Sequence, residues 1–401
     1  MKILILAPHP FYIVRGTPID LDLVLKVLSA RPDTEIDLVV YAAGEDREYP
    51  RTTLHRVGKA KWMRPGRPGF SVRKLLSTAA MFWKACGLVW NRMYDVIHAD
   101  EEAVFLAMFF RVLRGIPYVY DIDSSIAEQL MEQMPYMAWL AAIFGFFERL
   151  AMRGALYCLP VCNSLAELCR RNGVTRFVTL HDISQLANPD RPKTGSLARE
   201  IGVDKTILLY VGNLEKYQGI DLLLEGFAVA APKVETIDLV IIGGSDEHIR
   251  KYQEKAKNLG VAGRVHFLGP RPFDQLDEYL AEADILTAPR IRGRNTPMKV
   301  FPYLHAGRPV LVTDLPTHSQ ILTPDVAYLA KPDPEGFGAA IVELANDPEL
   351  RDRLAKAGVE FIERGHTLDA HKARLDEAYD WIADQISYKQ ESNRKQDDVV
   401  L

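Results

Sequence analysis

Short apolar runs alternate along the chain with glycine-containing loops and amphipathic segments of helical period. The first run covers residues 2–7, a loop containing Gly16 follows, and then a helix is expected over 19–30 and a second apolar run over 35–41. Strand, loop, helix and strand in this order open a doubly wound α/β domain. Ligands of such domains meet the loops at the carboxyl ends of the strands. Gly16 is therefore either a simple turn glycine or a point of close approach to a ligand.

The same alternation restarts in the second half of the chain, at the apolar run 206–211. The polar stretch before it, which contains prolines and glycines, predicts an inter-domain linker. The polar C-terminal end predicts disorder. The expected organisation is an N-terminal Rossmann-like domain over 1–184, a linker over 185–203, a second Rossmann-like domain over 204–370, a C-terminal helix over 371–388 and a disordered tail over 389–401.

Composition is that of a globular protein, and it excludes several functional classes. The chain has 401 residues, enough for two domains, with 48% hydrophobic and 25% charged residues. The net charge of −4 gives no global attraction to nucleic acid, and no nucleic-acid-binding module accompanies it. The four cysteines show no metal-binding spacing, which favours a reduced, cytoplasmic compartment. We expect no signal peptide and no membrane span.

The segment 285–314 has the strongest functional pattern in the chain. A short apolar run ends in an arginine-rich loop, and Asn295-Thr296-Pro297 then resembles a helix start. Unpaired N–H groups at a helix start, together with nearby guanidinium and ammonium groups, favour a phosphate or diphosphate. The alternative is a surface loop whose arginines are solvated. The expected anion ligands are Arg290, Arg292, Arg294, Asn295, Thr296, Pro297, Met298 and Lys299.

This segment resembles the donor-binding segment of the family-4 retaining glycosyltransferases. The resemblance rests on residues 296–299 and on residues 306–310, Ala-Gly-Arg-Pro-Val. It implies a GT-B fold, in which two Rossmann-like domains face each other across a cleft and the last helix crosses back to the first domain. It also implies a nucleotide-sugar donor, UDP- or GDP-linked. The family's two glutamates in this segment, for the sugar and the ribose, are replaced here by Arg294 and Pro302.

Other loops add candidate donor-binding residues through the same resemblance. The loop from Gly212 to Gly219 resembles the family's diphosphate-gripping loop, although Asn213 and Gln218 stand where basic residues are usual. Lys216 is expected to substitute for them. The remaining candidates are Gly243, which allows close approach after a strand, and His318, which follows a strand beside the expected donor site.

In the first domain, residues 95–99 resemble the family's Asp-Val-Ile-His-Ala signature, and Asp123 stands where the family often has a histidine. Asp123 is expected either to act as base for an acceptor hydroxyl or to cap the following helix. Asp121 and Asp123 form an Asp-x-Asp triplet, but it lies away from the expected diphosphate site. We therefore expect neither a bound metal nor a cofactor, because a helix start and basic residues can stabilise the leaving diphosphate.

Residues 51–94 contain ten basic residues, no acidic residue, and interleaved aromatic side chains. This pattern suits an anionic membrane surface; a core helix with a solvated basic face is the alternative. With the resemblance, it predicts a hexosyltransferase that acts peripherally on the inner face of the cytoplasmic membrane. The acceptor would be lipid-linked or a saccharide, as in envelope-polysaccharide synthesis. Two other hypotheses remain: a non-catalytic GT-B-like scaffold, and a nucleotide-sugar epimerase.

Overall fold

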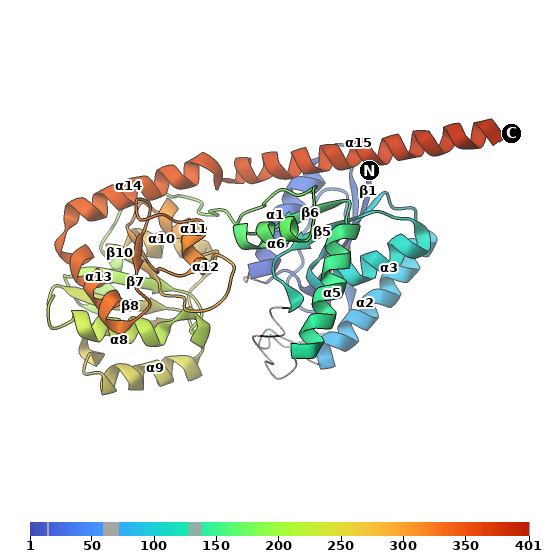
Figure 1. Ribbon diagram of the computed structural model, residues 1–401. Coiled ribbons are helices and arrows are strands. Elements are labelled where there is room, and N and C mark those ends of the chain that lie inside the picture. The colour runs from blue at the N-terminus through green and yellow to red at the C-terminus, as the bar shows by residue number, and fades with distance from the viewer. Residues whose placement is uncertain (14–15, 59–71, 128–130, 132–137, 401) are drawn as a thin grey trace. The chain divides into compact units, whose positions relative to one another are not determined.

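The computed structural model describes residues 1–13, 16–58, 72–127, 131 and 138–400 (Figure 1). Its contacts divide the chain into two compact units, one formed by residues 1–181 and 371–401 and the other by residues 182–370. Each unit is built on a six-stranded sheet whose neighbouring strands run parallel. The α/β class predicted from the alternating pattern is confirmed.

The first unit has the strand order β3-β2-β1-β4-β5-β6. Strands β2 and β3 lie on one side of β1 and strands β4 to β6 on the other, so the strand order reverses beside β1. Its strands are β1 (Lys2–Pro10), β2 (Glu35–Tyr41), β3 (Thr52–Val57), β4 (Val96–Asp100), β5 (Tyr118–Ile122) and β6 (Tyr157–Pro160). Its helices are α1 (Gly16–Ala30), α2 (Val72–Asn91), the 3-10 turn η2 (Glu101–Ala103), α3 (Val104–Arg114), α5 (Ala138–Gly154), α6 (Asn163–Arg171) and most of α15 (Leu368–Val400). All polar residues that follow β1, β4 and β5 therefore lie at one edge of the sheet.

The second unit repeats this topology, with the order β12-β11-β10-β7-β8-β9. Its strands are β7 (Thr206–Val211), β8 (Ile237–Ile242), β9 (Val265–Gly269), β10 (Ile285–Ala288), β11 (Val310–Thr313) and β12 (Tyr328–Ala330). Its α-helices are α7 (Ser196–Ile201), α8 (Ile220–Ala230), α9 (Asp246–Asn258), α10 (Leu276–Ala281), α11 (Val300–His305), α12 (Pro316–Ser319), α13 (Pro334–Asn346) and α14 (Pro348–Gly365). Its 3-10 turns are η4 (Lys216–Gln218), η5 (Ala262–Arg264) and η6 (Phe273–Gln275).

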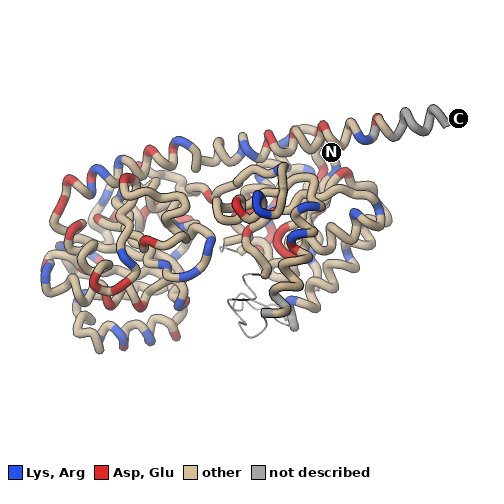
Figure 2. Tube along the Cα trace, in the orientation of Figure 1, with Lys and Arg blue, Asp and Glu red and all other residues tan. Residues whose placement is uncertain are grey.

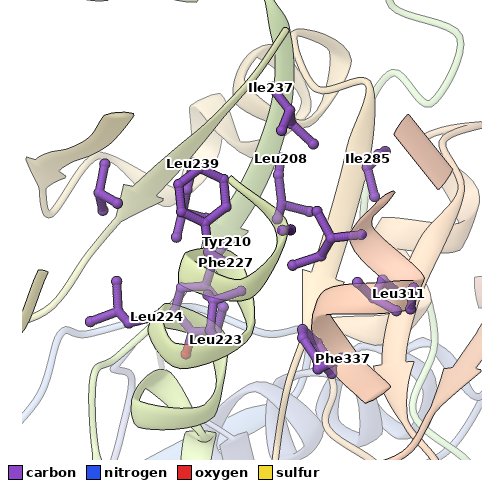
Figure 3. Packing of buried hydrophobic residues seen from close by; sticks show 14 of the residues in the cluster. Leu208, Tyr210, Leu223, Leu224, Phe227, Ile237, Leu239, Ile285, Leu311 and Phe337 are labelled. Atoms are coloured by element: carbon purple, nitrogen blue, oxygen red, sulfur yellow. The ribbon is translucent and has the colours of Figure 1, made fainter. Parts of the chain in front are cut away.

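Both faces of the second sheet are buried, as expected for a parallel sheet covered by helices. Leu208 and Tyr210 of β7 pack with Phe227 of α8 and Phe337 of α13 on one face (Figure 3). Leu209 points to the opposite face and joins a second cluster with residues of α11. This alternation fixes the direction of each β7 side chain, and it positions the loop that follows the strand.

Helix α15 packs against the first unit through polar and aromatic contacts. The Tyr379 hydroxyl lies 2.7 Å from His98 Nδ1, and Arg31 forms an ion pair of 2.7 Å with Asp376. The rings of Tyr157 and Trp381 lie 5.6 Å apart. The helix extends to Val400, although the sequence led us to expect disorder from residue 389.

The linker expected over 185–203 differs from the structure. Helix α7 lies inside the expected linker, because Leu197 is buried and Glu282 accepts hydrogen bonds from the Thr194 backbone and side chain. Residues 176–180 take part in the first sheet only through an isolated bridge between Phe177 and Cys158. No helix in the described part of the chain has the length and apolarity needed to cross a bilayer.

Candidate donor-binding site

The side chain of Lys299 is held at the carboxyl end of β7. Its ammonium donates a 2.8 Å hydrogen bond to the Tyr210 hydroxyl, which in turn donates to the Asn213 carbonyl oxygen at 2.6 Å. The ammonium also lies 4.0 Å from the centre of the Tyr210 ring. A Cβ placed on Gly212 would come within 2.3 Å of Lys299 Nζ. Glycine at 212 therefore leaves the room that the lysine occupies.

Burial changes the electrostatics of this lysine. Desolvation, and then repulsion by Arg290, lower the pKa of Lys299 from 10.5 to about 7. An ammonium that is partly removed from water and has no carboxylate partner among the described residues is costly, and an anion placed beside it would recover that free energy. Burial also raises the pKa of Tyr210, so its hydroxyl remains neutral and can hydrogen-bond the ammonium. This arrangement favours the binding of a negatively charged ligand.

Glycines allow the loops after β7, β8 and β10 to approach one another through their backbones. Gly243 has a φ of +112°, and a Cβ there would lie 2.2 Å from the Gly212 carbonyl oxygen. Gly219 has a φ of +77°, and a Cβ there would lie 1.8 Å from the Pro289 carbonyl oxygen. A larger residue at either position would force these strand-end loops apart. The close packing holds the loop 212–219 against the arginine-rich loop.

The arginine-rich loop after β10 is anchored by its first arginine. Arg290 Nε donates to the Arg292 carbonyl oxygen at 2.7 Å, and its guanidinium lies 5.3 Å from the centre of the Tyr217 ring. The Arg290 carbonyl oxygen accepts a 2.5 Å hydrogen bond from the Thr313 hydroxyl. The side chains of Arg292 and Arg294 are exposed. The loop thus has one fixed guanidinium and two that are open to solvent.

His318 supports this loop from α12 and carries no charge near neutral pH. It is fully buried, its Nδ1 lies 3.0 Å from the Thr313 carbonyl oxygen, and desolvation lowers its pKa to about 3. The neighbouring Thr317 hydroxyl donates to the Asn295 carbonyl oxygen at 2.7 Å. These contacts fix the loop backbone. A charged interaction of His318 with phosphate does not fit this environment.

The helix start lies later than the sequence suggested. Helix α11 begins at Val300, and a turn over residues 297–299 precedes it, with the Val300 amide donating to the Pro297 carbonyl oxygen. The expectation that Asn295-Thr296-Pro297 starts the helix is therefore wrong by several residues. Pro302 lies in the first turn of α11, and its ring, in place of a glutamate, offers no acceptor for a ribose hydroxyl.

The other predicted residues of the second unit differ in their exposure to solvent. Thr296 and Pro297 are buried, while Met298 is partly exposed. Asn213 accepts a 3.2 Å hydrogen bond from the Glu215 amide through Oδ1, and Lys216 is exposed at the start of η4.

In the first unit, Asp123 follows β5 and is 8% exposed. It lies within a cluster of acidic side chains, because Asp123, Glu101 and Asp121 all raise the pKa of Asp100 after desolvation. Asp121 Oδ2 lies at a hydrogen-bonding distance of 3.1 Å from His98 Nε2. Gly16 begins α1, and a Cβ there would meet open space. Packing within the unit therefore does not require glycine at position 16.

A histidine at the end of β1 belongs to the same cluster. His9 Nε2 lies 2.8 Å from Asp100 Oδ2, and burial lowers the pKa of His9 to about 4. Burial and Glu102 raise the pKa of Glu101 to about 7, while the Lys74 ammonium lies 2.6 Å from Glu102. Desolvation and repulsion between carboxylates therefore favour the protonated forms of Asp100 and Glu101. Across the described residues, no group of three or more His, Cys, Asp or Glu side chains is arranged to hold a metal ion.

Sequence reasoning missed several residues of these sites. His9 and Asp100 end parallel strands, and the rule that selected Asp123 would have selected them as well. Tyr210 carried no comparable signal, because a tyrosine in an apolar run is typical of a core strand. Its role depends on the contact with Lys299, which lies far away in the sequence.

Two family models match the chain, one in each unit. The model described as "Glycosyl transferase 4-like domain" matches residues 24–181, and "Glycosyl transferases group 1" matches residues 198–361. The chain belongs to the family-4 glycosyltransferases. The match covers both Rossmann-like units and includes the Lys299 site.

Individual relatives of this glycosyltransferase agree with the family assignment. A phosphatidyl-myo-inositol mannosyltransferase of Mycobacterium leprae is 27% identical over 304 residues, which cover 73% of this chain and 72% of that protein. The structure of sucrose-phosphate synthase from Thermosynechococcus elongatus covers 96% of this chain and 99% of its own, with a TM-score of 0.77 and 17% identity. Anabaena Alr3699/HepE in complex with UDP-glucose has a TM-score of 0.72 and 14% identity, over 95% of this chain and 99% of its own. These structures show that the fold is GT-B, as predicted.

Proposed function

We propose that this glycosyltransferase transfers a hexose from a UDP- or GDP-sugar to an acceptor with retention of configuration and without a bound metal. The observation that carries the proposal is the ammonium of Lys299, held against Gly212 without a carboxylate partner among the described residues. A nucleotide diphosphate supplies the charge that this lysine requires. The complex of HepE with UDP-glucose, a protein of the same fold, supports a nucleotide-sugar donor.

The basic side chains would stabilise the leaving diphosphate as the bond to the sugar breaks. Lys299 and Arg290 would act from fixed positions, while Arg292, Arg294 and Lys216 would close onto the phosphates from solvent. The backbone N–H groups of Thr296, Met298 and Lys299 would add hydrogen bonds to the phosphate or sugar. Three arginines and two lysines can offset the diphosphate charge that other enzymes balance with a cation.

The proposed role of Asp123 is that of a base beside the acceptor hydroxyl. It follows a parallel strand of the first unit and is surrounded by other carboxyl groups. Repulsion within such a cluster favours the uptake of a proton by one of its members. Asp123 would thus accept the acceptor proton.

The proposed acceptor is lipid-linked or part of an envelope polysaccharide, reached from the inner face of the cytoplasmic membrane. The Mycobacterium leprae relative is named for phosphatidyl-myo-inositol, which is a lipid. The basic and aromatic residues of 51–94 support contact with an anionic membrane.

The test is calorimetric titration of the protein with UDP, GDP, ADP and their sugars, in the presence of EDTA, followed by assays of donor turnover. We expect one nucleotide to bind and its sugar to be transferred or slowly hydrolysed. Binding without any turnover would favour a non-catalytic scaffold, which the replacement of both glutamates by Arg294 and Pro302 makes a specific alternative. Interconversion of free sugar nucleotides without an acceptor would identify an epimerase. Loss of activity in EDTA would refute the metal-independent mechanism.

A further inference from the structure

Helices α2, α3 and α5 of the first unit form one layer with large apolar side chains on its outer surface. Phe82 of α2 packs against Phe109 of α3 with ring centroids 5.4 Å apart, and Phe105 of α3 lies 6.5 Å from Phe144 of α5. Helix α3 therefore packs against both α2 and α5 (Figure 1). We call the outer surface of these helices the three-helix face.

Several large apolar side chains on the three-helix face are exposed to solvent. Trp83 of α2 is 72% exposed, Val112 of α3 is 89% exposed, and Trp139 of α5 is 64% exposed. Phe146 and Phe147 are also about half exposed, at 54% and 46%. Single exposed apolar residues are common, but several of them on neighbouring helices indicate an interaction surface.

All exposed charges on the described side chains of these helices are positive. The exposed ionisable residues are Lys84, Arg111, Arg114, Arg149 and Arg153. Figure 2 colours the Lys and Arg positions of the chain blue. Glu148 is the only acidic residue in the three helices, and it is buried, where it accepts hydrogen bonds from the Ser125 hydroxyl and the Ile126 amide.

The basic surplus of residues 51–94 does not by itself explain this face. Arg56 pairs with Asp46 at 2.7 Å, Lys74 with Glu102 at 2.6 Å, and Arg92 with Asp37 at 2.8 Å. These charges are balanced within the unit, and residues 59–71 lie outside the described part of the chain. The positive charge available to a partner therefore includes α3 and α5, which lie beyond the stretch identified from the sequence.

We propose that the three-helix face binds a lipid bilayer with anionic head groups. Trp83, Val112 and Phe146 would enter the interface between head groups and acyl chains, while the surrounding arginines and Lys84 would meet lipid phosphates. A second copy of this chain fits less well, because it would bring two uniformly positive faces together. This proposal refines the membrane contact proposed above, and its test requires no sugar transfer.

The experiment is flotation of the full chain with phosphatidylcholine vesicles, with and without phosphatidylglycerol, at increasing salt. Each neutralised basic residue should weaken binding to anionic vesicles about fivefold, so Lys84→Gln with Arg149→Gln should weaken it about 25-fold. Trp83→Ser with Phe146→Ser should weaken it at least about tenfold, since apolar burial is lost. All four side chains are exposed, so the melting temperature should not change.

Matched controls come from another helix and another exposed aromatic residue. Arg250→Gln with Lys257→Gln removes two exposed charges from α9, where Asp246 and Glu247 provide negative charge as well. Tyr388→Ser removes an aromatic ring that is 71% exposed on α15. Both control variants should float like the unchanged chain.

Absence of flotation with anionic vesicles would overturn the proposal, as would face variants that bind as well as the controls. A concentration-dependent dimer that Trp83→Ser abolishes, without vesicle binding, would assign the face to a second copy instead. Nucleotide titration of the same variants separates this proposal from the donor site. Face variants should lose vesicle binding and retain nucleotide binding, whereas a chain that floats but binds no nucleotide would refute only the donor site.

Discussion

Replacing Lys299 with methionine should stabilise the free protein and weaken its binding of nucleotide diphosphates. The pKa of this lysine is lowered from 10.5 to about 7, first by burial and then by Arg290. The folded state therefore binds fewer protons than the unfolded chain between pH 7 and 10.5, so stability rises with pH across that window. Below pH 7 the buried ammonium costs at most about 5 kcal/mol. Methionine has a similar length and carries no charge.

The measurement is thermal unfolding of the Lys299→Met variant and the unchanged protein from pH 6 to pH 10. The variant should melt higher at pH 6, by about 2–4 °C for each kcal/mol recovered, and the difference should shrink towards pH 10. Lys233→Met, at an exposed lysine of the same unit, is the control and should produce no such trend. A variant that is less stable at pH 6, or a difference that does not depend on pH, would refute the burial of a charged lysine.

Nucleotide binding should be linked to the same proton. A bound diphosphate raises the pKa of Lys299 again, so the site takes up close to one proton on binding at pH 8. Affinity should be constant below pH 7 and should fall up to about tenfold per pH unit above it. Calorimetry in buffers of different ionisation enthalpy measures the proton uptake. No uptake, together with unchanged affinity in the Lys299→Met variant, would contradict the role of this lysine.

Three further substitutions test other residues of the two units. Arg292→Ala with Arg294→Ala should weaken nucleotide binding without lowering the melting temperature, because both side chains are exposed; unchanged affinity would reject their role. Gly219→Ala should destabilise the second unit by more than about 1 kcal/mol in chemical denaturation, since φ is +77° and the added Cβ meets the Pro289 carbonyl; a neutral effect would show that the loops do not pack as described. Asp123→Asn should abolish transfer while titration still shows nucleotide binding; retained transfer would exclude Asp123 as the base.

Elements with complete local signals were predicted well from the sequence. Strands β2 and β7 have the expected bounds, 35–41 and 206–211, because apolar residues dominate both segments. Strand β3 was missed, since its sequence alternates polar and apolar residues and lies within the basic stretch. The start of α11 was placed too early because Asn295-Thr296-Pro297 has the composition of a helix cap but forms a loop. Composition identifies a candidate cap, whereas backbone geometry decides it.

The sequence predicted the positive charge of the candidate site but not the contacts that position its side chains. A lysine and three arginines after a strand indicated an anion site. The sequence contains no sign that the Tyr210 hydroxyl holds Lys299, because that contact depends on the order of β7 and β10 in the sheet. The distribution of exposed charge also required the structure, since pairing of Arg56 and Arg92 with distant carboxylates removes them from the basic surface.

The most direct test of the donor site is a crystal structure of the protein with the nucleotide diphosphate selected by titration. The proposal predicts density for the terminal phosphate within about 3 Å of Lys299 Nζ, beside Gly212 and the Arg290 loop. A nucleotide bound elsewhere, with the Lys299 ammonium still hydrogen-bonded only to Tyr210, would contradict it.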